Sequence, residues 1–283
     1  MSKPPIGRDT RLCMSLSGRP GNAGSRLHNY LYAAMGLDYV YKSFTTTDLP
    51  AAIGGFRALG IRGCAISMPF KEAVIPLIDV LEPSAAVIDS VNTILNDDGY
   101  LTGYNTDYSA VRTMLRASPA DPAKPFLLRG SGGMAKAVAA ALRYAGFTQG
   151  TIVARNPVSG PALAAQYGFQ WLPQLPEQGA PLLVNVTPLG MEGPDARTMA
   201  YPQAMVEAAE MVIDVVAQPA LTPLIRAALA AGKPVITGAE VVVLQAVEQF
   251  TLYTGVEPDR ALVIEAARFA HGDMTADRLA AAL

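Results

Sequence analysis

A glycine-rich segment at residues 130–135 is the part of this chain best suited to binding a charged small molecule. A strand-like run at 126–129 leads into it, and a helix-like run at 134–144 follows. Glycine lets a backbone turn tightly and approach a pyrophosphate, and the free N–H groups that begin the next helix attract its negative charge. Similar glycine patterns occur in ordinary turns, but this context predicts a dinucleotide site made of Gly130, Ser131, Gly132, Gly133, Met134 and Ala135.

The end of the next predicted strand, residues 151–154, indicates which dinucleotide would bind. NAD-binding proteins usually carry Asp or Glu at this place to hold the ribose hydroxyls. This chain instead has Arg155 and Asn156, with no acid nearby. Because a guanidinium suits the 2′-phosphate that distinguishes NADP, we expect NADP as the cofactor. The alternative is that Arg155 is an ordinary solvated arginine.

Four polar positions outside this segment stand in otherwise apolar surroundings. Lys71 follows a strand-like run at 64–67, Asn92 lies inside a hairpin-like run, Asn-Thr-Asp occupies 105–107, and Gln245 lies in an apolar helix-like run. Each has an ordinary alternative as a solvated, capping or backbone-bonded side chain. Beside a dinucleotide site, however, a lysine near a carboxylate can transfer the proton of an alcohol. Asn and Gln amides can bind the hydroxyls of a polyol.

The elements that must position these residues alternate between strands and helices. In the first half we expect strands at 11–16, 39–44 and 64–67, a helix at 26–35, a helix from the N-cap Asp48 to near Gly60, a helix after Pro69, and a hairpin with strands 91–95 and 100–102. In the second half we expect a helix at 107–116, strands at 126–129, 151–154, 182–186, 211–216 and 234–237, and helices after Gly238. This alternation predicts an α/β fold with mostly parallel sheets.

Composition excludes several classes of protein. Of the 283 residues, 51% are hydrophobic and 16% charged, so the chain can bury a large core, and the net charge of −2 argues against nucleic acid and anionic membranes as partners. No apolar run is long enough to span a bilayer, and the first residues lack a signal-peptide core. Cys13 and Cys64 lack metal-like spacing, and only two histidines are present, so we expect no metal site and a cytoplasmic location.

Short segments along nearly the whole chain resemble the shikimate dehydrogenase family. The run 67–72, Ser-Met-Pro-Phe-Lys-Glu, is similar to the family's T-V-P-F-K-E. Further matches, in order, are 90–93 to A-V-N-T, 105–107 to N-T-D, 130–135 to G-A-G-G-A-x, 154–156 to N-R-T, 185–191 to N-A-T-x-x-G-M, 222–224 to T-P-L, and 245–246 to Q-A. So many matches in one order are more specific than any single motif.

The resemblance implies two α/β domains and a role for each matching residue. The substrate domain would comprise 1–107 and 239–283, and a Rossmann-like NADP domain would comprise 108–238. Lys71 and Asp107 would be catalytic. The substrate would be bound by Ser67, Asn92 and Gln245, and the cofactor by the glycine segment with Arg155, Asn156, Thr187 and Gly238. The implied reaction is 3-dehydroshikimate + NADPH ⇌ shikimate + NADP, on shikimate or a related hydroxylated cyclic carboxylic acid.

The chain departs from the family where the substrate carboxylate is held. The family has S-x-S-P-x-x-H-N, and alignment on His28-Asn29 puts Asn22 and Gly24 at the two serines and Ser25 at the proline. In addition, Val216-Ala217 leaves no tyrosine hydroxyl where the family has V-Y. We therefore expect Asn22 and Ser25 to bind the substrate, with Arg19 or Arg26 as a candidate partner of its carboxylate, and only weak activity on shikimate.

Three other functions remain open from the sequence. The main substrate could be quinate or another polyol acid, with NAD disfavoured by Arg155. The chain could be a non-catalytic sensor of ligand and cofactor, although a sensor has no need of Lys71 and Asp107. A folate-linked dehydrogenase fits the N-T-D and Q-A segments poorly. The sequence also leaves open a homodimer as the quaternary state.

Overall fold

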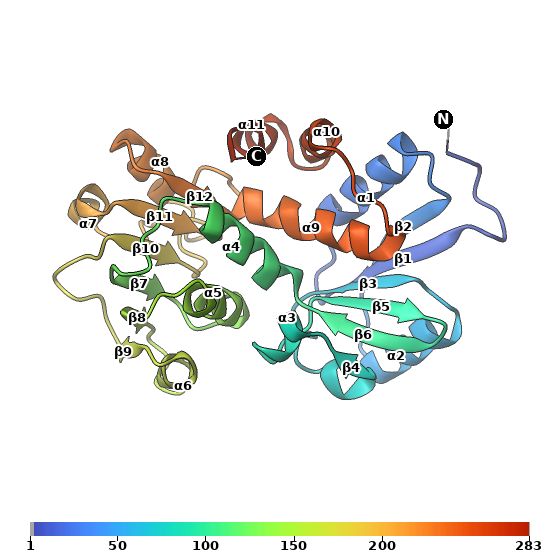
Figure 1. Cartoon of the computed structure of the whole chain (residues 1–283), viewed down its shortest axis with the longest axis horizontal. Coiled ribbons are helices and arrows are strands. Elements are labelled where there is room, and N and C mark those ends of the chain that lie inside the picture. The colour runs from blue at the N-terminus through green and yellow to red at the C-terminus, as the bar shows by residue number, and fades with distance from the viewer. Residues whose placement is uncertain (1–2, 283) are drawn as a thin grey trace. The chain divides into compact units, whose positions relative to one another are not determined.

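A computed structural model describes residues 3–282 and divides the chain into two compact units (Figure 1). The first, unit 1, contains the chain up to Thr106 together with the chain from Val243 onward. The second, unit 2, is Asp107–Val242. Each unit is built around its own six-stranded sheet. The fold is therefore α/β, as the alternation of strands and helices predicted.

Unit 1 has a mixed sheet in the order β2-β1-β3-β5-β6-β4. Strands β1, β2 and β3 are parallel, while β3, β5 and β6 pair antiparallel. Helix α1 packs against β2 and α10, and α10 packs against α11. The elements are β1 (Arg11–Leu16), α1 (Ala23–Ala34), β2 (Tyr39–Phe44), α2 (Leu49–Ala58), β3 (Gly63–Ile66), β4 (Val80–Leu81), α3 (Pro83–Ala86), β5 (Thr93–Asp97), β6 (Tyr100–Tyr104), α9 (Gly238–Thr254, in unit 1 from Val243), α10 (Arg260–His271) and α11 (Asp273–Ala282).

Local sequence signals account for several of these elements. Asp48 caps α2 as predicted, because its side chain accepts a hydrogen bond from Ala51 N at 3.0 Å. The predicted hairpin is present, although its first strand is shifted by two residues to Thr93–Asp97, its second is longer, and only Asp98-Gly99 lie between them. Both of these residues have positive φ, 51° and 92°, as a two-residue hairpin turn of this kind requires.

The helix predicted after Pro69 was wrong. The chain there forms turns and only one short 3₁₀ segment, Ile75–Leu77. Pro76 explains this, because it has no N–H to donate and disfavours helical backbone at the residue before it. The short elements β4 and α3 were not predicted, and α1 begins at Ala23 rather than at 26.

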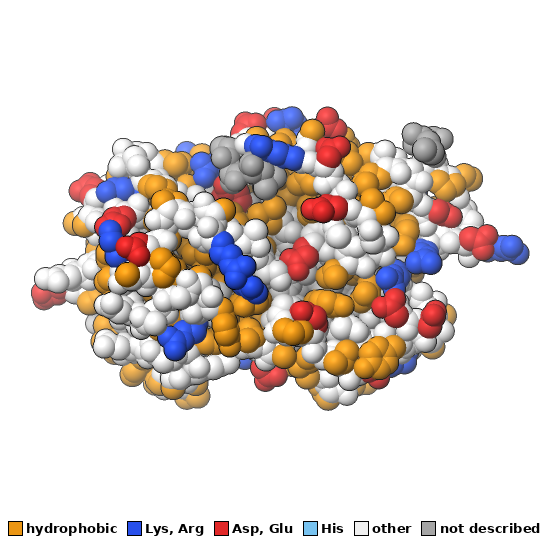
Figure 2. Space-filling view, viewed as in Figure 1, with side chains coloured by type: hydrophobic (Ala, Val, Ile, Leu, Met, Phe, Trp, Pro, Cys, Tyr) orange, Lys and Arg blue, Asp and Glu red, His pale blue; other side chains and the backbone are white. Residues whose placement is uncertain are grey.

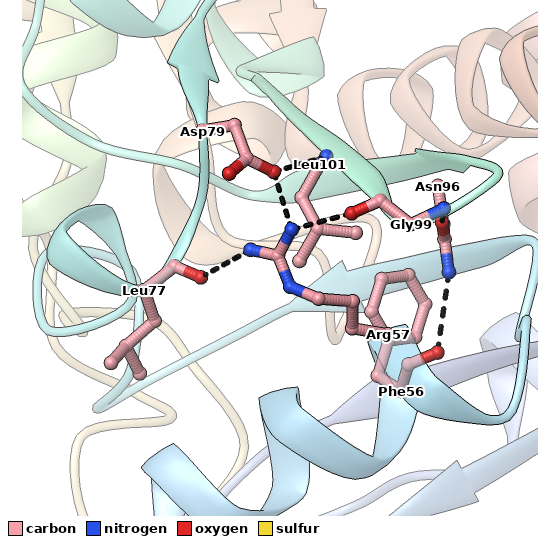
Figure 3. Close-up of polar contacts among 7 residues, drawn as sticks. All are labelled: Phe56, Arg57, Leu77, Asp79, Asn96, Gly99 and Leu101. Atoms are coloured by element: carbon pink, nitrogen blue, oxygen red, sulfur yellow. Dashed lines mark hydrogen bonds and ion pairs between the residues drawn. The ribbon is translucent and has the colours of Figure 1, made fainter.

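Arg57, in the last turn of α2, ties three segments of unit 1 together (Figure 3). Its guanidinium donates to Leu77 O at 3.2 Å and to Gly99 O, and it pairs with Asp79 at 2.6 Å. The same Asp79 carboxylate accepts from Leu101 N at 2.7 Å. One side chain thus links the segment after Lys71 to the hairpin that follows Asn92.

We expect Arg57→Ala to destabilise the protein, because it leaves the carbonyls of Leu77 and Gly99 without this donor and Asp79 without its cation. Arg57 lowers the pKa of Asp79, so the part that comes from this pair is present above the ordinary carboxyl pKa and is lost as the pH falls through the lowered pKa. Urea unfolding measures the effect. The matched control is Arg8→Ala, which breaks the exposed Arg8–Asp9 pair. Equal midpoints for the two variants would contradict this structural role.

Unit 2 has a wholly parallel sheet in the order β12-β11-β10-β7-β8-β9. Counted within the unit this is 6-5-4-1-2-3, the doubly wound order of dinucleotide-binding folds. Helix α6 packs on β8 and β9, and α8 packs on β11 and β12. The elements are α4 (Thr106–Ala117, in unit 2 from Asp107), β7 (Phe126–Arg129), α5 (Gly133–Tyr144), β8 (Gly150–Val153), α6 (Ser159–Tyr167), β9 (Gln170–Leu172), β10 (Leu182–Asn185), α7 (Gln203–Ala208), β11 (Met211–Asp214), α8 (Pro223–Ala230) and β12 (Val235–Thr237).

The core of unit 2 explains the apolar runs of its strands. Leu127, Val153, Leu183 and Val212, each from a different strand, pack in one buried cluster with α7 and α8. Strands covered on both faces have little use for polar side chains, so β10 and β11 are buried at every position. The short strand β9 was not predicted. It has only three residues.

The surface of the molecule mixes charges of both signs. On the face in Figure 2, Lys and Arg side chains are interspersed with Asp and Glu. Within residues 3–282, no helix combines the length and the hydropathy that crossing a membrane would require.

Candidate active site and cofactor-binding site

The glycine segment joins β7 to α5 at the point where the strand order of unit 2 reverses, between β7 and β10. Gly130 has φ of 121°, and a Cβ there would lie 2.8 Å from Val186 Cγ2 and 3.0 Å from Val186 O. A side chain is therefore excluded at Gly130, and the turn lies directly against the loop after β10. Ligands of doubly wound sheets bind at such a reversal point, beyond the carboxyl ends of the strands.

The start of α5 is free to receive an anion. Its N-cap is Gly132, no side chain caps the helix, and its first turn has no acidic residue. A Cβ at Gly132 or Gly133 would meet no described atom within 4 Å, so this side of the turn is open. Met134 is half-buried, Ala135 is buried, and the Ser131 hydroxyl lies 2.8 Å from that of Ser159. Uncapped N–H groups on an open glycine turn fit a pyrophosphate.

The chain after β8 presents Arg155 to solvent. The preceding Ala154 is held by Trp171, whose indole N–H donates to Ala154 O at 3.1 Å. The residue after it, Asn156, accepts hydrogen bonds from Val158 N at 2.8 Å and Ser159 N at 3.1 Å. The side-chain oxygen of Asn156, Oδ1, therefore shapes the turn that carries Arg155.

A second arginine, Arg129, lies close to Arg155 and was not identified from the sequence. It is half-buried at the end of β7 and donates to Ala200 O. Burial lowers the pKa of Arg129, and the nearby Arg155 charge lowers it further. In the described part of the chain, neither arginine forms an ion pair with an acidic side chain. The available signal was a charged residue at the end of an otherwise apolar strand.

Two more predicted cofactor residues follow strand ends of unit 2, Thr187 in the loop after β10 and Gly238 at the start of α9, directly after β12. The Thr187 hydroxyl donates to Asn185 Oδ1 at 2.6 Å and accepts from Leu189 N at 3.2 Å, so it is used within its own loop. A Cβ at Gly238 would overlap the main chain of Val215 and Val216, so glycine is required for α9 to begin there.

In unit 1, Lys71 is half-buried and its carbonyl accepts from Val91 N at 2.9 Å. This bond holds the lysine's backbone against the chain that leads to Asn92. Ser67 is exposed just after β3, and its N–H donates to Leu16 O at 2.9 Å. Both residues stand at the end of a buried strand, as expected. The other predicted catalytic residue, Asp107, lies in the first turn of α4, at the start of unit 2.

Asn92 and Gln245 meet through Thr106. Asn92 is only 3% exposed, donates to Thr106 Oγ1 at 3.0 Å and accepts from Thr106 N at 2.8 Å. The Thr106 hydroxyl also lies 3.2 Å from Gln245 Oε1. Gln249, which the sequence did not single out, donates to Thr93 Oγ1 at 2.9 Å in the same cluster. The Asn92 amide therefore holds the backbone turn that immediately precedes Asp107.

The start of α1 gives the predicted substrate residues different surroundings. Asn22 is exposed, and its side chain does not cap the helix. The Ser25 hydroxyl lies 2.8 Å from that of Ser43 in β2, and the Arg26 guanidinium lies over the Phe269 ring, 5.5 Å from its centroid. Arg19 is exposed, and within residues 3–282 its side chain forms no hydrogen bond or ion pair. Of the two arginines, Arg19 is therefore the one still available to a ligand.

The His28-Asn29 pair is part of the framework of α1. Asn29 donates to Tyr41 O at 2.8 Å and accepts from Tyr41 N at 3.0 Å, which ties α1 to β2. His28 is fully buried and stacks on Tyr41 with ring centroids 4.3 Å apart. Burial lowers the pKa of His28 to about 4, so it is neutral at physiological pH.

Taken together, these features define a two-domain α/β protein whose second unit has the doubly wound sheet of dinucleotide-binding folds. A family model described as the shikimate dehydrogenase substrate binding domain matches residues 23–94. A "Shikimate dehydrogenase-like protein" of Haemophilus influenzae is 52% identical over 266 residues, covering 94% of this chain and 98% of the relative. The chain belongs to the shikimate dehydrogenase family.

Solved structures agree with this assignment. Shikimate 5-dehydrogenase of Thermus thermophilus, in complex with NADP(H) and shikimate, superposes with a TM-score of 0.82 at 32% identity, covering 92% of this chain and 99% of the other. Quinate dehydrogenase of Corynebacterium glutamicum, in complex with NAD, also gives 0.82 at 27% identity, covering 92% of this chain and 98% of the other. Similar folds thus accompany different substrates and cofactors.

Two glycine substitutions should separate folding from binding, with NADPH as the probe. Gly133→Ala adds a methyl group on the open side of the turn, so we expect an unchanged melting temperature but weaker NADPH binding. Gly238→Ala forces main chain apart, so we expect a stability loss of about 1–3 kcal/mol. Thermal unfolding and fluorescence titration measure the two effects. Similar destabilisation by both changes would show that the turn is not open.

Proposed function

We propose that this chain is an NADP-dependent dehydrogenase. It would transfer hydride reversibly between NADP and a hydroxyl of shikimate or a related hydroxylated cyclic carboxylic acid, as in 3-dehydroshikimate + NADPH ⇌ shikimate + NADP. The observation that carries the proposal is the uncapped, open glycine turn of unit 2 beside two arginines that have no acidic partner among the described residues. Membership of the shikimate dehydrogenase family supports the reaction class.

The cofactor residues fit NADP better than NAD. The N–H groups at the start of α5 would hold the pyrophosphate, and Arg155 would hold the 2′-phosphate in a charge-assisted contact. Asn156 would keep Arg155 in place by shaping its turn. NADP, when bound, supplies or accepts the hydride. Thr187 and Gly238 would line the same strand ends.

Side chains of the protein would transfer the proton of the substrate hydroxyl. The Lys71 ammonium would donate a proton to the substrate oxygen during reduction, and its amine would accept that proton during oxidation. Asp107 would hold the lysine and the substrate hydroxyl in position. Ser67, Asn92 and Gln245 would orient the substrate, with Asn92 acting also through the turn that precedes Asp107.

A second candidate is a dehydrogenase of quinate or another polyol acid. It is favoured by the start of α1, where Gly24 has no hydroxyl, Ser25 lies against Ser43 and Arg26 is stacked on Phe269. These features leave Asn22 and Arg19 to hold a carboxylate in place of two serines. We also propose a cytoplasmic location, because Cys13 and Cys64 are buried free thiols. A homodimer stays a prediction.

We expect Arg155→Ala to weaken NADPH binding by about tenfold or more while leaving NADH binding nearly unchanged. The reason is that a charged hydrogen bond to phosphate contributes roughly 1.5–3 kcal/mol. Cofactor titrations and kcat/KM measure the change. Arg143→Ala, at the far end of α5, is the matched control. Equal efficiency of the unmutated protein with NAD and NADP would refute the assignment of Arg155.

Initial rates with shikimate, quinate and related acids, each with NADP and NAD, test the function itself. We expect detectable but slow turnover of shikimate.

Lys71→Ala and Asp107→Ala should each lower kcat by about 10²–10⁴-fold. The effects of the two changes should be less than additive when combined, because both residues act on one proton. Lys42→Ala, an exposed lysine of β2, is the control, and circular dichroism checks folding. Near-normal turnover in the folded Lys71 variant would sink the mechanism, and cofactor binding without any turnover would favour a sensor.

A further inference from the structure

Asp214, the last residue of β11, is a buried carboxylate to which the proposed reaction assigns no role. It is 0% exposed, and burial raises its pKa to about 6. No ion pair with it occurs in the described part of the chain. A buried carboxyl group without a cation is stable only if hydrogen-bond partners replace the lost water. The segments that supply the hydrogen-bond donors around Asp214 are therefore the segments that it holds in place.

The donors come from two loops at the carboxyl edge of the sheet. Asp214 Oδ1 accepts from Asn185 Nδ2 at 2.9 Å and from Val216 N at 3.1 Å. Asp214 Oδ2 accepts from Thr222 Oγ1 at 2.6 Å, and Thr222 in turn caps α8. One carboxylate thus joins the loop after β10 to the loop after β11.

The bond to Asn185 determines which way that amide faces. Val216 N donates to Asp214 Oδ1 and Thr187 N donates to Asn185 Oδ1, so Asn185 turns its NH2 group toward Asp214. Its Oδ1 then faces its own loop and accepts from Thr187 N at 3.1 Å and from Thr187 Oγ1 at 2.6 Å. The remaining amide hydrogen goes to Leu189 O at 3.2 Å. Every polar group of Asn185 is used, and a flipped amide would lose all of these bonds.

The loop held in this way lies against the glycine turn. A Cβ at Gly130 would come within 3.1 Å of Thr187 Cγ2 as well as meeting Val186. On its other side, a Cβ at Gly190 would come within 3.1 Å of Thr222 Cβ. The loop is therefore packed between the proposed pyrophosphate site and the segment that Asp214 anchors. A shift of this loop would therefore move atoms that line the proposed pyrophosphate site and would change the affinity for the cofactor.

We propose that Asp214 is a positioning residue for cofactor binding, which it affects through Asn185 by holding the 185–190 loop against the glycine turn. This inference rests on the proposed function, because it assumes that a dinucleotide occupies that turn. It assigns no direct contact between Asp214 and the cofactor. The competing interpretation is that Asp214 only stabilises the sheet edge and the start of α8.

The test compares Asp214→Ala, which removes both carboxylate oxygens, with two matched variants. Val212→Ala, in the same strand, removes buried methyl groups without touching the hydrogen bonds, so it should lower the melting temperature alone. Thr222→Val removes the donor to Oδ2 and leaves the Asn185 bond, so it should weaken the cap of α8 alone. Asp214→Ala removes the acceptor of the Asn185 bond, so it should reduce hydrogen-exchange protection of the Thr187 and Leu189 amides in cofactor-free protein. It should also raise the Kd for NADPH about tenfold.

A double mutant shows whether the effect passes through Asn185. In an Asn185→Ala background, Asp214→Ala should change the Kd for NADPH no further. If Asp214→Ala does not fold, Asn185→Ala alone provides the same two measurements from the other side of the hydrogen bond. Folded Asp214→Ala with wild-type exchange and wild-type Kd would overturn the proposal. Absence of turnover in the unmutated protein would instead refute the proposed function, because neither readout depends on turnover.

Discussion

Close approach of main chain to main chain at the carboxyl edge of the unit 2 sheet is the constraint on which the cofactor half of this protein depends. Gly130 lies against Val186, and Gly238 lies against Val215 and Val216, at distances that no side chain would allow. These contacts pack the turn after β7 against the loop after β10, and the start of α9, directly after β12, against the chain after β11. Because the four strands are parallel, their carboxyl ends already share one edge, and the glycines remove the remaining separation.

Asparagine amides hold the loops that this packing brings together. Asn29 ties α1 to β2, Asn92 holds the turn before Asp107, and Asn185 closes the loop that contains Thr187. In each case the amide both donates and accepts, so its orientation is set by its partners. Such residues look like ligand-binding groups in a sequence because they are polar in apolar surroundings. In this structure they first satisfy backbone groups, which would be costly to bury unpaired.

The substrate end of unit 1 is less constrained by its own contacts. The framework pair His28-Asn29 fixes α1 on β2, yet the first turn of that helix has lost the serines of the family pattern. Ser25 and Arg26 are engaged by Ser43 and Phe269, while Asn22 and Arg19 face solvent. A rigid framework whose first helical turn differs from the family pattern is the physical basis of the proposed substrate preference. It is consistent with similar folds that carry both shikimate and quinate dehydrogenases.

The sequence by itself determined the α/β class, the glycine turn, the basic strand end at Arg155 and most long elements, because these depend on local propensity and on periodicity over a few residues. Prediction from the sequence failed for short elements and for contacts between residues that are distant in the chain. Pro76 prevented the helix expected after Pro69, and the short strands β4 and β9 form only because a neighbouring strand is there to pair with them. Only the tertiary structure placed Arg129 beside Arg155, stacked Arg26 on Phe269 and joined Asp214 to Asn185. These pairings involve residues far apart in the chain, so the spacing of residue types carries no trace of them.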